Sequence, residues 1–437
     1  MGNLSSLIPQ QTETVAAIYK WHEDNERKTT RFSRRLGASI IGHECDRYLW
    51  MQFRWCVKPS FSGRMLRLFK TGHLAEPRFV EELRGIGCEV HEVDQATGNQ
   101  IEVTAIGGHF IDKLDAVILG LPEAEKAWHV GEFKTFGGTE DTSKDFEKLS
   151  DGGVKKAKPL HYAQCQVGMG LTKMDRAFYL AVKKATDELY SERLEFNSKE
   201  FKSIMTRAER IIKSNSPCER CATRADDFRC KLCDAYKLCW GLGEVALPLP
   251  IKSCRTCCHA TPEMDGDGKW GCTKSAKMEP CEKHLILPQL ITFAEPTDAG
   301  DDWIEFKNTN KEGQVWRHGE GEGQWTTEEL MNTPATLVGV ATKVKEVLGA
   351  TVVGFEVPTL SLIDRYDPKD SRLLWEGQSD SDELEPKLES LLGCHLAKAI
   401  PTNKEDTAET QAIEYQGKYL VVLYKESQYV AVWGGVE

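Results

Sequence analysis

The sequence predicts an α/β protein in which a sheet is flanked by helices, and three observations support this class. Short apolar segments of strand composition follow one another with turn residues between them. A helical pattern precedes them, in which Phe79, Val80 and Leu83 recur at core spacing, and another helix follows from Pro159 to Met169. The six predicted strands are 88–93, 100–105, 109–119, 128–135, 177–183 and 188–196.

Helices and one loop are predicted around this sheet. Residues 1–70 and 199–213 are predicted to be helical, and the helix that carries Phe79 begins at Thr71 and ends near Gly85 or Gly87. The stretch 137–158 is rich in Lys, Asp and Gly and is therefore predicted to be a mobile loop.

The last third of the chain gives weaker patterns. Residues 419–424 and 429–433 predict a hairpin, and 338–360 predicts a further strand pair. The acidic stretch 376–389 is predicted to be a linker or a solvated helix face.

Length and composition indicate an ordinary globular protein. The chain has 437 residues, a mass of 49.2 kDa and 40% hydrophobic residues, enough for two or three packed domains. No apolar run reaches the ~18 residues that a membrane span requires, and the N-terminus does not resemble a signal peptide. A cytoplasmic protein without membrane contact is expected.

Charge is distributed unevenly along the chain. Residues 286–437 carry 13 Lys and Arg against 27 Asp and Glu, a net −14, which leaves +3 for residues 1–285. The acidic third is predicted to recruit a protein partner. Within 17–70, by contrast, 12 basic residues outnumber 5 acidic ones and are interleaved with aromatics. This composition suits a single nucleic-acid strand, although a solvated helix with buried aromatics explains it equally well.

Two carboxylates and a lysine are expected to meet in the sheet. Asp115 lies in one predicted strand, and Glu132 and Lys134 share a face of the next, because strand side chains repeat every second residue. Carboxylates bind Mg2+ or Mn2+, and Lys134 would orient and stabilise a forming hydroxide. The pattern predicts metal-dependent phosphodiester hydrolysis; the alternative is a surface hairpin with an incidental ion pair.

Two further residues are candidates for the same site. Glu76 is expected to project from a helix start beside the sheet. Gln164 precedes the apolar stripe of the helix after the sheet, where it would contact a phosphate or hold the lysine, although a lone helical Gln is usually solvated.

Fifteen cysteines without a secretion signal predict metal sites rather than disulfides. Cys230, Cys233 and Cys239 give three soft ligands within ten residues, and Cys45 is the candidate for the fourth. Four thiolates suit an iron–sulfur cluster or tetrahedral zinc. The alternative is a local zinc knuckle built from Cys218, Cys221, Cys230 and Cys233, with Cys45 and Cys239 as buried thiols.

A second cysteine group predicts a small structural zinc ribbon. Cys254, Cys257 and Cys272 supply three Zn2+ ligands, and either Cys281 or His284 supplies the fourth. Because four protein ligands leave no open position, this zinc is expected to be structural.

Taken together, these motifs resemble the PD-(D/E)XK nuclease superfamily, in the RecB-like branch with phage exonucleases and iron–sulfur nucleases. The resemblance covers roughly residues 36–241, and the Cys254–His284 segment resembles a zinc-ribbon extension of phage members. The matching segments are Gly72–Glu76, Gly108–Asp115, Gly131–Thr135, His161–Gln164, and Cys45-Asp46-Arg47 with Cys230, Cys233 and Cys239.

The resemblance implies a restriction-endonuclease-like mixed sheet and assigns roles. Glu76, Asp115 and Glu132 would bind the metal, Phe133 would offer its backbone carbonyl, and Lys134 would serve the nucleophile. The Cys45 group would hold a 4Fe-4S cluster. Two positions depart from the branch, which has Tyr where Gly168 stands and often His where Glu76 stands.

The resemblance also implies a domain organisation: a nuclease domain over 1–247, a zinc-ribbon segment over 248–286 and an acidic α+β region over 287–437. The expected function is a Mg2+- or Mn2+-dependent deoxyribonuclease. It would act as an exonuclease on single-stranded DNA or DNA ends, in recombination, repair or phage DNA metabolism, in the host cytoplasm if phage-encoded. The rival is a non-catalytic nucleic-acid-binding or scaffold protein with structural metal clusters.

Overall fold

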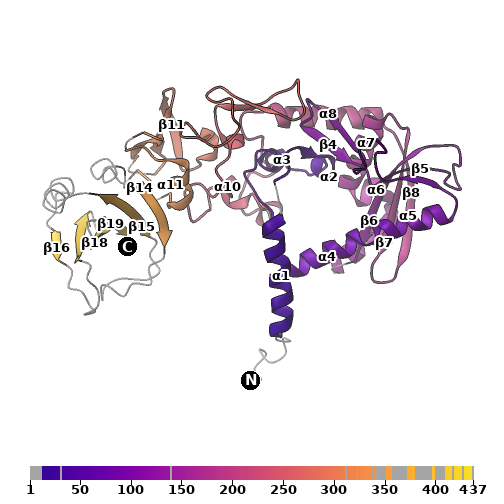
Figure 1. Ribbon diagram of the computed structural model, residues 1–437, viewed down its shortest axis with the longest axis horizontal. Coiled ribbons are helices and arrows are strands. Elements are labelled where there is room, and N and C mark those ends of the chain that lie inside the picture. Colours follow the sequence, from indigo (N-terminus) through magenta and orange to yellow (C-terminus); the bar gives the residue numbers. More distant parts are fainter. Residues whose placement is uncertain are drawn as a thin grey trace.

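A computed structural model describes most of the chain up to residue 342 and six strands beyond it (Figure 1). The described residues are 12–29, 32–137, 140–310, 313–321, 323–335, 338–339, 342, 351–356, 372–378, 396–398, 409–415, 418–425 and 428–435. The helices before the sheet are α1 (Glu13–Thr29), α2 (Ala38–Ile41), α3 (Asp46–Phe53), α4 (Gly63–His73) and α5 (Glu76–Gly85).

Five strands form the central sheet in the order β2-β5-β6-β7-β8. Their bounds are β2 Glu89–His91, β5 Ala116–Leu119, β6 His129–Phe136, β7 Arg176–Lys183 and β8 Glu188–Glu195. Strands β6 and β7 are parallel, whereas the other neighbours are antiparallel, so the sheet is mixed. A parallel pair needs a crossover, which α6 (Glu140–Ala157) and α7 (Pro159–Thr172) provide. The predicted α/β class is confirmed.

Side chains of β6 alternate between two hydrophobic clusters. Phe133 packs against Phe79 of α5, with ring centroids 5.3 Å apart. Phe136 belongs to the opposite cluster, which α6 and α7 cover. Because strand residues repeat every second position, Glu132 and Lys134 lie on the α7 side of the sheet.

The predicted strand 109–119 is in fact two strands in two sheets. β4 (Phe110–Lys113) pairs with β1 (Leu36–Gly37) and β3 (Glu102–Ala105), whereas β5 belongs to the central sheet. A chain that changes sheets must bend, and Leu114-Asp115 forms the bend. Asp115 therefore lies at the start of β5 rather than inside a strand.

The predicted loop 137–158 is also corrected, because residues 140–157 form α6. Its helical path is interrupted at Gly153, where φ is 69°. Phe146 and Leu149 lie three residues apart and are both buried in the cluster with Phe136. This pair provides the apolar face that the many charged residues conceal in the sequence.

The predicted helix from Thr71 is divided between α4 and α5. Leu74 and Ala75 separate the two helices, and Pro77 lies in the first turn of α5. Proline has no backbone N–H to continue a preceding helix but fits a first turn, so it favours a new start here.

One hydrophobic cluster joins the N-terminal helices to the segments after the central sheet. It runs from Leu36 through α3 and α8 (Ser198–Lys213) to Val338, across the predicted boundaries at 247/248 and 286/287. Its later elements are α10 (Tyr236–Trp240), η2 (Cys254–Thr256), β9 (Ala260–Pro262), β10 (Trp270–Cys272), η3 (Pro288–Leu290), β11 (Ala294–Ala299), β12 (Trp303–Asn308), β13 (Val315–Gly319) and α11 (Thr327–Asn332). The short helix α9 (Phe228–Lys231) lies between α8 and α10 in the chain and contributes no residue to this cluster. The described residues between 248 and 338 therefore share a hydrophobic cluster with the first region.

The C-terminal strands form a six-stranded sheet in the order β14-β15-β19-β18-β17-β16. Their bounds are β14 Thr351–Glu356, β15 Arg372–Gln378, β16 Leu396–Lys398, β17 Glu409–Tyr415, β18 Lys418–Lys425 and β19 Gln428–Gly435. The predicted hairpin is confirmed, since β18 and β19 pair antiparallel. Of the strand pair predicted within 338–360, β14 is one strand, and it pairs with β15. Most of the remainder of this range lies outside the described residues. Most of the acidic stretch 376–389 lies outside the described residues.

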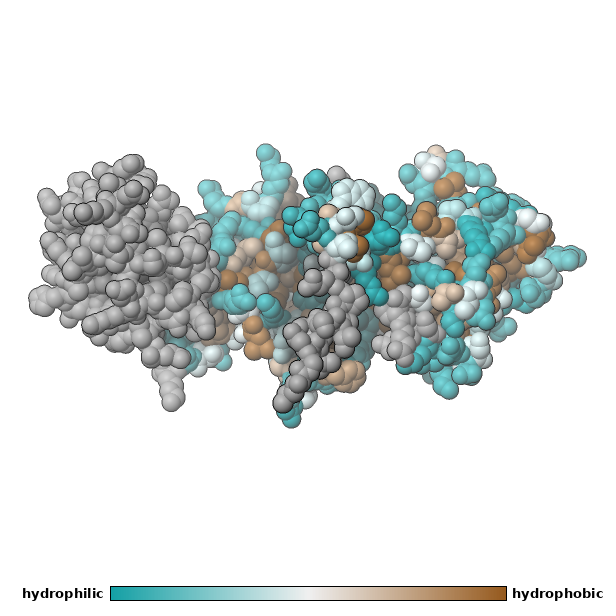
Figure 2. All heavy atoms as spheres, turned by 90° about the horizontal axis from the view of Figure 1, so that it is seen from below, coloured by the Kyte–Doolittle hydropathy of each residue, from teal (hydrophilic) through white to brown (hydrophobic). Residues whose placement is uncertain are grey.

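On the face drawn in Figure 2, apolar residues form separate patches between hydrophilic ones over the described surface. Among the helices that the structure describes, none combines the length and the apolar composition that a bilayer crossing requires.

Candidate functional site

The predicted acidic residues and lysine meet where β5 and β6 pair. Ala116 lies opposite Gly131, so Asp115 precedes β5 next to Glu132. The backbone N–H of Phe133 donates to Asp115 Oδ2 over 2.7 Å. Lys134 Nζ lies 3.9 Å from Asp115 Oδ2, forms an ion pair with Glu132 Oε1, and donates to the Phe133 carbonyl over 3.1 Å.

Burial determines the electrostatics of this cluster. Glu132 is 2% exposed, and burial raises the pKa of its carboxyl to about 8, although the Lys134 ammonium opposes the shift. Burial alone would lower the pKa of Lys134, but attraction to Glu132 and Asp115 overrides it and raises that pKa. Lys134 is therefore held charged between the carboxylates.

Asp112 is a buried carboxylate of the same cluster that the sequence reasoning missed. It lies in β4, and burial, followed by the charge of Asp115, raises the pKa of its carboxyl to about 7. Gln164 of α7 is buried and hydrogen-bonds to Asp112. Gln164 thus reaches the cluster through Asp112. The available signal was an aspartate in the apolar run Phe110-Ile111, three residues before Asp115.

Gly168 leaves the space that Asp112 occupies. A Cβ at Gly168 would lie 3.0 Å from Asp112 Oδ2 and 3.1 Å from Val130 Cγ1. A side chain at this position would therefore displace the Asp112 carboxylate.

Gly168→Ala is expected to lower the free energy of unfolding by about 1–3 kcal/mol through overpacking. Thermal or urea unfolding measures this. Gly85→Ala is the matched control, since a Cβ there meets nothing within 4 Å and Ala favours the helix. Equal stability of the two variants would contradict the contact between Asp112 and α7.

Glu76 lies apart from this cluster. It starts α5, its side chain is 46% exposed, and its Oε1 lies 3.3 Å from His73 Nδ1. Within the described residues, Lys134 pairs with Asp115 and Glu132 but not with Glu76. The structure therefore brings together Asp115, Glu132 and Lys134. Gln164 reaches them through Asp112, whereas Glu76 pairs with His73.

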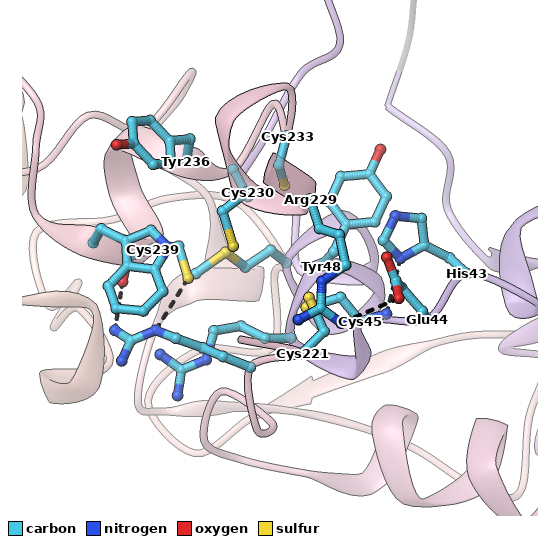
Figure 3. A pocket seen from close by; sticks show the side chains of 15 residues that line it. His43, Glu44, Cys45, Tyr48, Cys221, Arg229, Cys230, Cys233, Tyr236 and Cys239 are labelled. Carbon is cyan, nitrogen blue, oxygen red and sulfur yellow. Dashed lines mark hydrogen bonds and ion pairs between the residues drawn. The ribbon is translucent and has the colours of Figure 1, made fainter. Parts of the chain in front are cut away.

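Five cysteines line a single pocket, which Figure 3 shows (Cys45, Cys221, Cys230, Cys233 and Cys239). Cys45 immediately precedes α3, while the other four come from the segment 221–239 and lie far away in sequence. The start of α3 is anchored by Asp46, which forms ion pairs with Arg207 and Arg210 of α8. The Nε–H of Arg220 donates to Cys239 Sγ over 3.3 Å.

The pocket differs from both predicted four-cysteine sets. It contains the whole set Cys45, Cys230, Cys233 and Cys239, and it adds Cys221. Cys218, which the local knuckle requires, does not line it. Cys221 lies against Cys45, and burial, followed by that contact, raises the pKa of the Cys221 thiol to about 12.

The second cysteine group lies around η2 and β10. Burial, followed by the nearby Cys257, Cys272 and Cys281, raises the pKa of the Cys254 thiol to about 11, so these four cysteines are neighbours. The backbone N–H of Lys274 donates to Cys272 Sγ over 3.4 Å.

His284 is engaged elsewhere. It is 1% exposed, its Nδ1 lies 2.8 Å from Thr327 Oγ1, and its Nε2 lies 2.9 Å from the Ser253 carbonyl. With both ring nitrogens occupied, the geometry favours Cys281 as the fourth ligand.

Cys281→Ser is accordingly expected to lower the zinc content by about one per chain, because three remaining thiolates do not close a tetrahedral site. His284→Gln is expected to keep the zinc. Elemental analysis of both purified proteins measures the difference. Zinc loss in His284→Gln alone would reverse the assignment.

The donor sets fit the predicted metals, but none of the sites is preformed. Asp112, Asp115 and Glu132 face a single ammonium, an excess of carboxylate oxygens that suits Mg2+ or Mn2+. The two cysteine groups suit soft metals. As placed, no three His, Cys, Asp or Glu side chains of the described residues converge closely enough to hold an ion by themselves.

Comparison with known proteins gives only weak similarities. No family model matches the sequence, and no curated protein matches it. Among solved structures, SSO0001 covers 52% of this chain and 95% of its own, with 15% identity and a TM-score of 0.30. An alkaline exonuclease from Laribacter hongkongensis covers 44% of this chain and 90% of its own, with 13% identity and a TM-score of 0.29. The complex of that exonuclease with dAMP covers 45% of this chain and 90% of its own, with 14% identity and a TM-score of 0.29. Similarities at this level carry no argument about this chain.

Proposed function

We propose that this protein is a divalent-metal-dependent deoxyribonuclease of the PD-(D/E)XK type, acting on single-stranded DNA or DNA ends. The observation that carries the proposal is the meeting of Asp115, Glu132 and Lys134 at the β5–β6 pair, with Lys134 Nζ within reach of both carboxylates.

The metal would be held by Asp115 and Glu132, and the Phe133 carbonyl lies beside them. When bound, Mg2+ or Mn2+ supplies a lowered pKa for an attacking water and neutralises charge that develops on the phosphorus oxygens. Asp112 adds a third carboxyl group that interacts with Asp115 and, when ionised, makes the electrostatic potential of the site more negative. Gln164 holds Asp112 in place through a hydrogen bond.

Lys134 is proposed to orient the attacking water and to stabilise the hydroxide as it forms. Its ammonium is fixed from two sides, by Glu132 Oε1 and by the Phe133 carbonyl. A donor held in place before the reaction stabilises developing charge without reorganisation, which is the arrangement that electrostatic catalysis requires.

We further propose that the five-cysteine pocket holds a structural cluster, with Cys45, Cys230, Cys233 and Cys239 as ligands of a 4Fe-4S centre, and that Cys254, Cys257, Cys272 and Cys281 hold Zn2+. The support is that Cys45 lines the same pocket as four cysteines of the distant segment 221–239, and that one of them, Cys239, accepts a hydrogen bond from Arg220.

The proposed activity is tested by incubating the purified chain with end-labelled single-stranded and duplex DNA, with Mn2+ or with EDTA. Degradation with Mn2+ and none with EDTA is expected. Binding of DNA that persists in EDTA, without any cleavage when Mg2+ or Mn2+ is added, would favour the rival non-catalytic binding protein.

A further inference from the structure

Helix α4 presents basic side chains that have no acidic partner. Between Gly63 and His73 it contains Arg64, Arg67 and Lys70 and no acidic residue. All three are exposed, and within the described part of the chain none of them forms an ion pair. Because they recur every third residue, they form a stripe along one face of the helix.

The far end of α4 lies beside the strand that carries the proposed catalytic lysine. A Cβ at Gly72 would lie 3.1 Å from Thr135 Oγ1, and Thr135 follows Lys134 in β6. Lys184, just after β7, donates from Nζ to the Leu68 carbonyl over 3.4 Å. Figure 1 shows α4 running from its crossing with α1 toward β6 and β7. The basic stripe therefore leads toward the acidic cluster.

Aromatic rings are exposed along the same helix. Phe69 and Phe61 are 39% and 40% exposed and meet edge to face, with centroids 4.9 Å apart. The crossing with α1 fixes the start of α4, where the Gly63 N–H donates to Glu23 Oε1 over 2.7 Å and the helices touch at Tyr19. Trp21 of α1 is 57% exposed.

We propose that α4 is the track along which one strand of single-stranded DNA reaches the acidic cluster, an inference that rests on the proposed function. The unpaired cations of α4 would contact successive phosphates, and Phe69 and Phe61 would stack on bases. Duplex DNA is the less suitable occupant, because its base faces are already stacked and unavailable to exposed rings.

The track is tested by fluorescence anisotropy with a labelled oligothymidylate in EDTA, where no cleavage interferes. The double variant Arg67→Gln/Lys70→Gln is compared with Lys199→Gln/Lys202→Gln, which removes the same charge from exposed positions of α8. Thermal unfolding of each variant verifies the fold.

Loss of two phosphate contacts is expected to weaken DNA binding roughly tenfold or more at 50 mM salt. The slope of the logarithm of the binding constant against the logarithm of the salt concentration is expected to become less negative by about 1.4. The α8 control is expected to bind as the parent chain does. Phe69→Ala is expected to weaken binding by about fivefold or more through lost stacking.

Equal binding by the α4 and α8 variants would overturn the track, as would a parent chain that does not bind the oligothymidylate. Duplex competing as well as single strand, with Phe69→Ala silent, would overturn the single-strand assignment. Cleavage of DNA with Mn2+ is scored separately. If only the α4 variant loses DNA binding and the parent chain does not cleave DNA, the track is supported and the proposed nuclease activity is contradicted. If the parent chain cleaves DNA and the α4 and α8 variants bind it equally, the nuclease activity is supported and the track is contradicted.

Discussion

Lys134→Met is expected to slow DNA cleavage with Mn2+ by about 10²–10³-fold, the usual cost of losing one preorganised donor to developing charge. The substitution keeps much of the side-chain volume but removes the ammonium between Glu132 and Asp115. Single-turnover rates on end-labelled DNA measure the effect. Anisotropy in EDTA is expected to show unchanged DNA binding, because Lys134 is proposed to serve the nucleophile rather than the phosphate backbone.

The matched control for this variant is Lys252→Met. Both lysines are mostly buried, at 24% and 15% side-chain exposure, and both pair with carboxylates, but Lys252 pairs with Glu320 and Glu328. Destabilisation by a lost buried ion pair should therefore appear in both variants, and loss of cleavage only in Lys134→Met. Cleavage by Lys134→Met at the parent rate would contradict the proposed role.

The acidic cluster could be predicted from sequence as far as local geometry determines it. Glu132 and Lys134 share a face because they are two apart in one strand, and Asp115 joins them because β5 and β6 are consecutive and antiparallel. Asp112 could not be placed in this way, since its approach depends on β4 leaving the central sheet and on the missing side chain at Gly168. For Glu76, the sequence predicted the helix but not the side-chain contact. Its pairing with His73 depends on the side-chain rotamers, which the helical pattern does not determine.

The fold shows the same division between local pattern and tertiary context. Strands β6, β7 and β8 lie within a residue or two of their predicted bounds. In β7 the six residues from Ala177 to Val182 form a continuous apolar run, which is a local pattern. Helix α6 was missed because its glycines and charges resemble a loop, whereas its stability comes from Phe146 and Leu149 packing on the sheet. The continuous packing across 247/248 could not be predicted from the sequence either. The segment 247–250 has the composition of a linker, yet Leu247 and Leu249 are buried.

Cys45→Ser is expected to remove the metal of the five-cysteine pocket and to lower the free energy of unfolding by about 2–5 kcal/mol, similar to the loss of a native cross-link. Cys45 is the proposed ligand that would tie the start of α3 to the segment 221–239, so its loss would release this cross-link as well as one metal bond. Iron, sulfide and zinc measured on anaerobically purified protein, together with thermal unfolding, report the two effects. The parent chain is expected to hold about four iron, as a 4Fe-4S cluster with four cysteine ligands requires.

Cys218→Ser is the control that distinguishes the two proposed ligand sets. Cys218 is buried in the same region, but it does not line the pocket, and its backbone carbonyl accepts from Arg47 Nε over 2.7 Å. Its substitution is therefore expected to leave the metal in place, because a serine preserves that carbonyl. Metal loss in Cys218→Ser with retention in Cys45→Ser would establish the local zinc knuckle instead. Cys221 lines the pocket beside Cys45 and is also a member of the local zinc knuckle. If Cys221→Ser keeps the iron, Cys221 is not a ligand, and Cys45, Cys230, Cys233 and Cys239 are sufficient for the cluster.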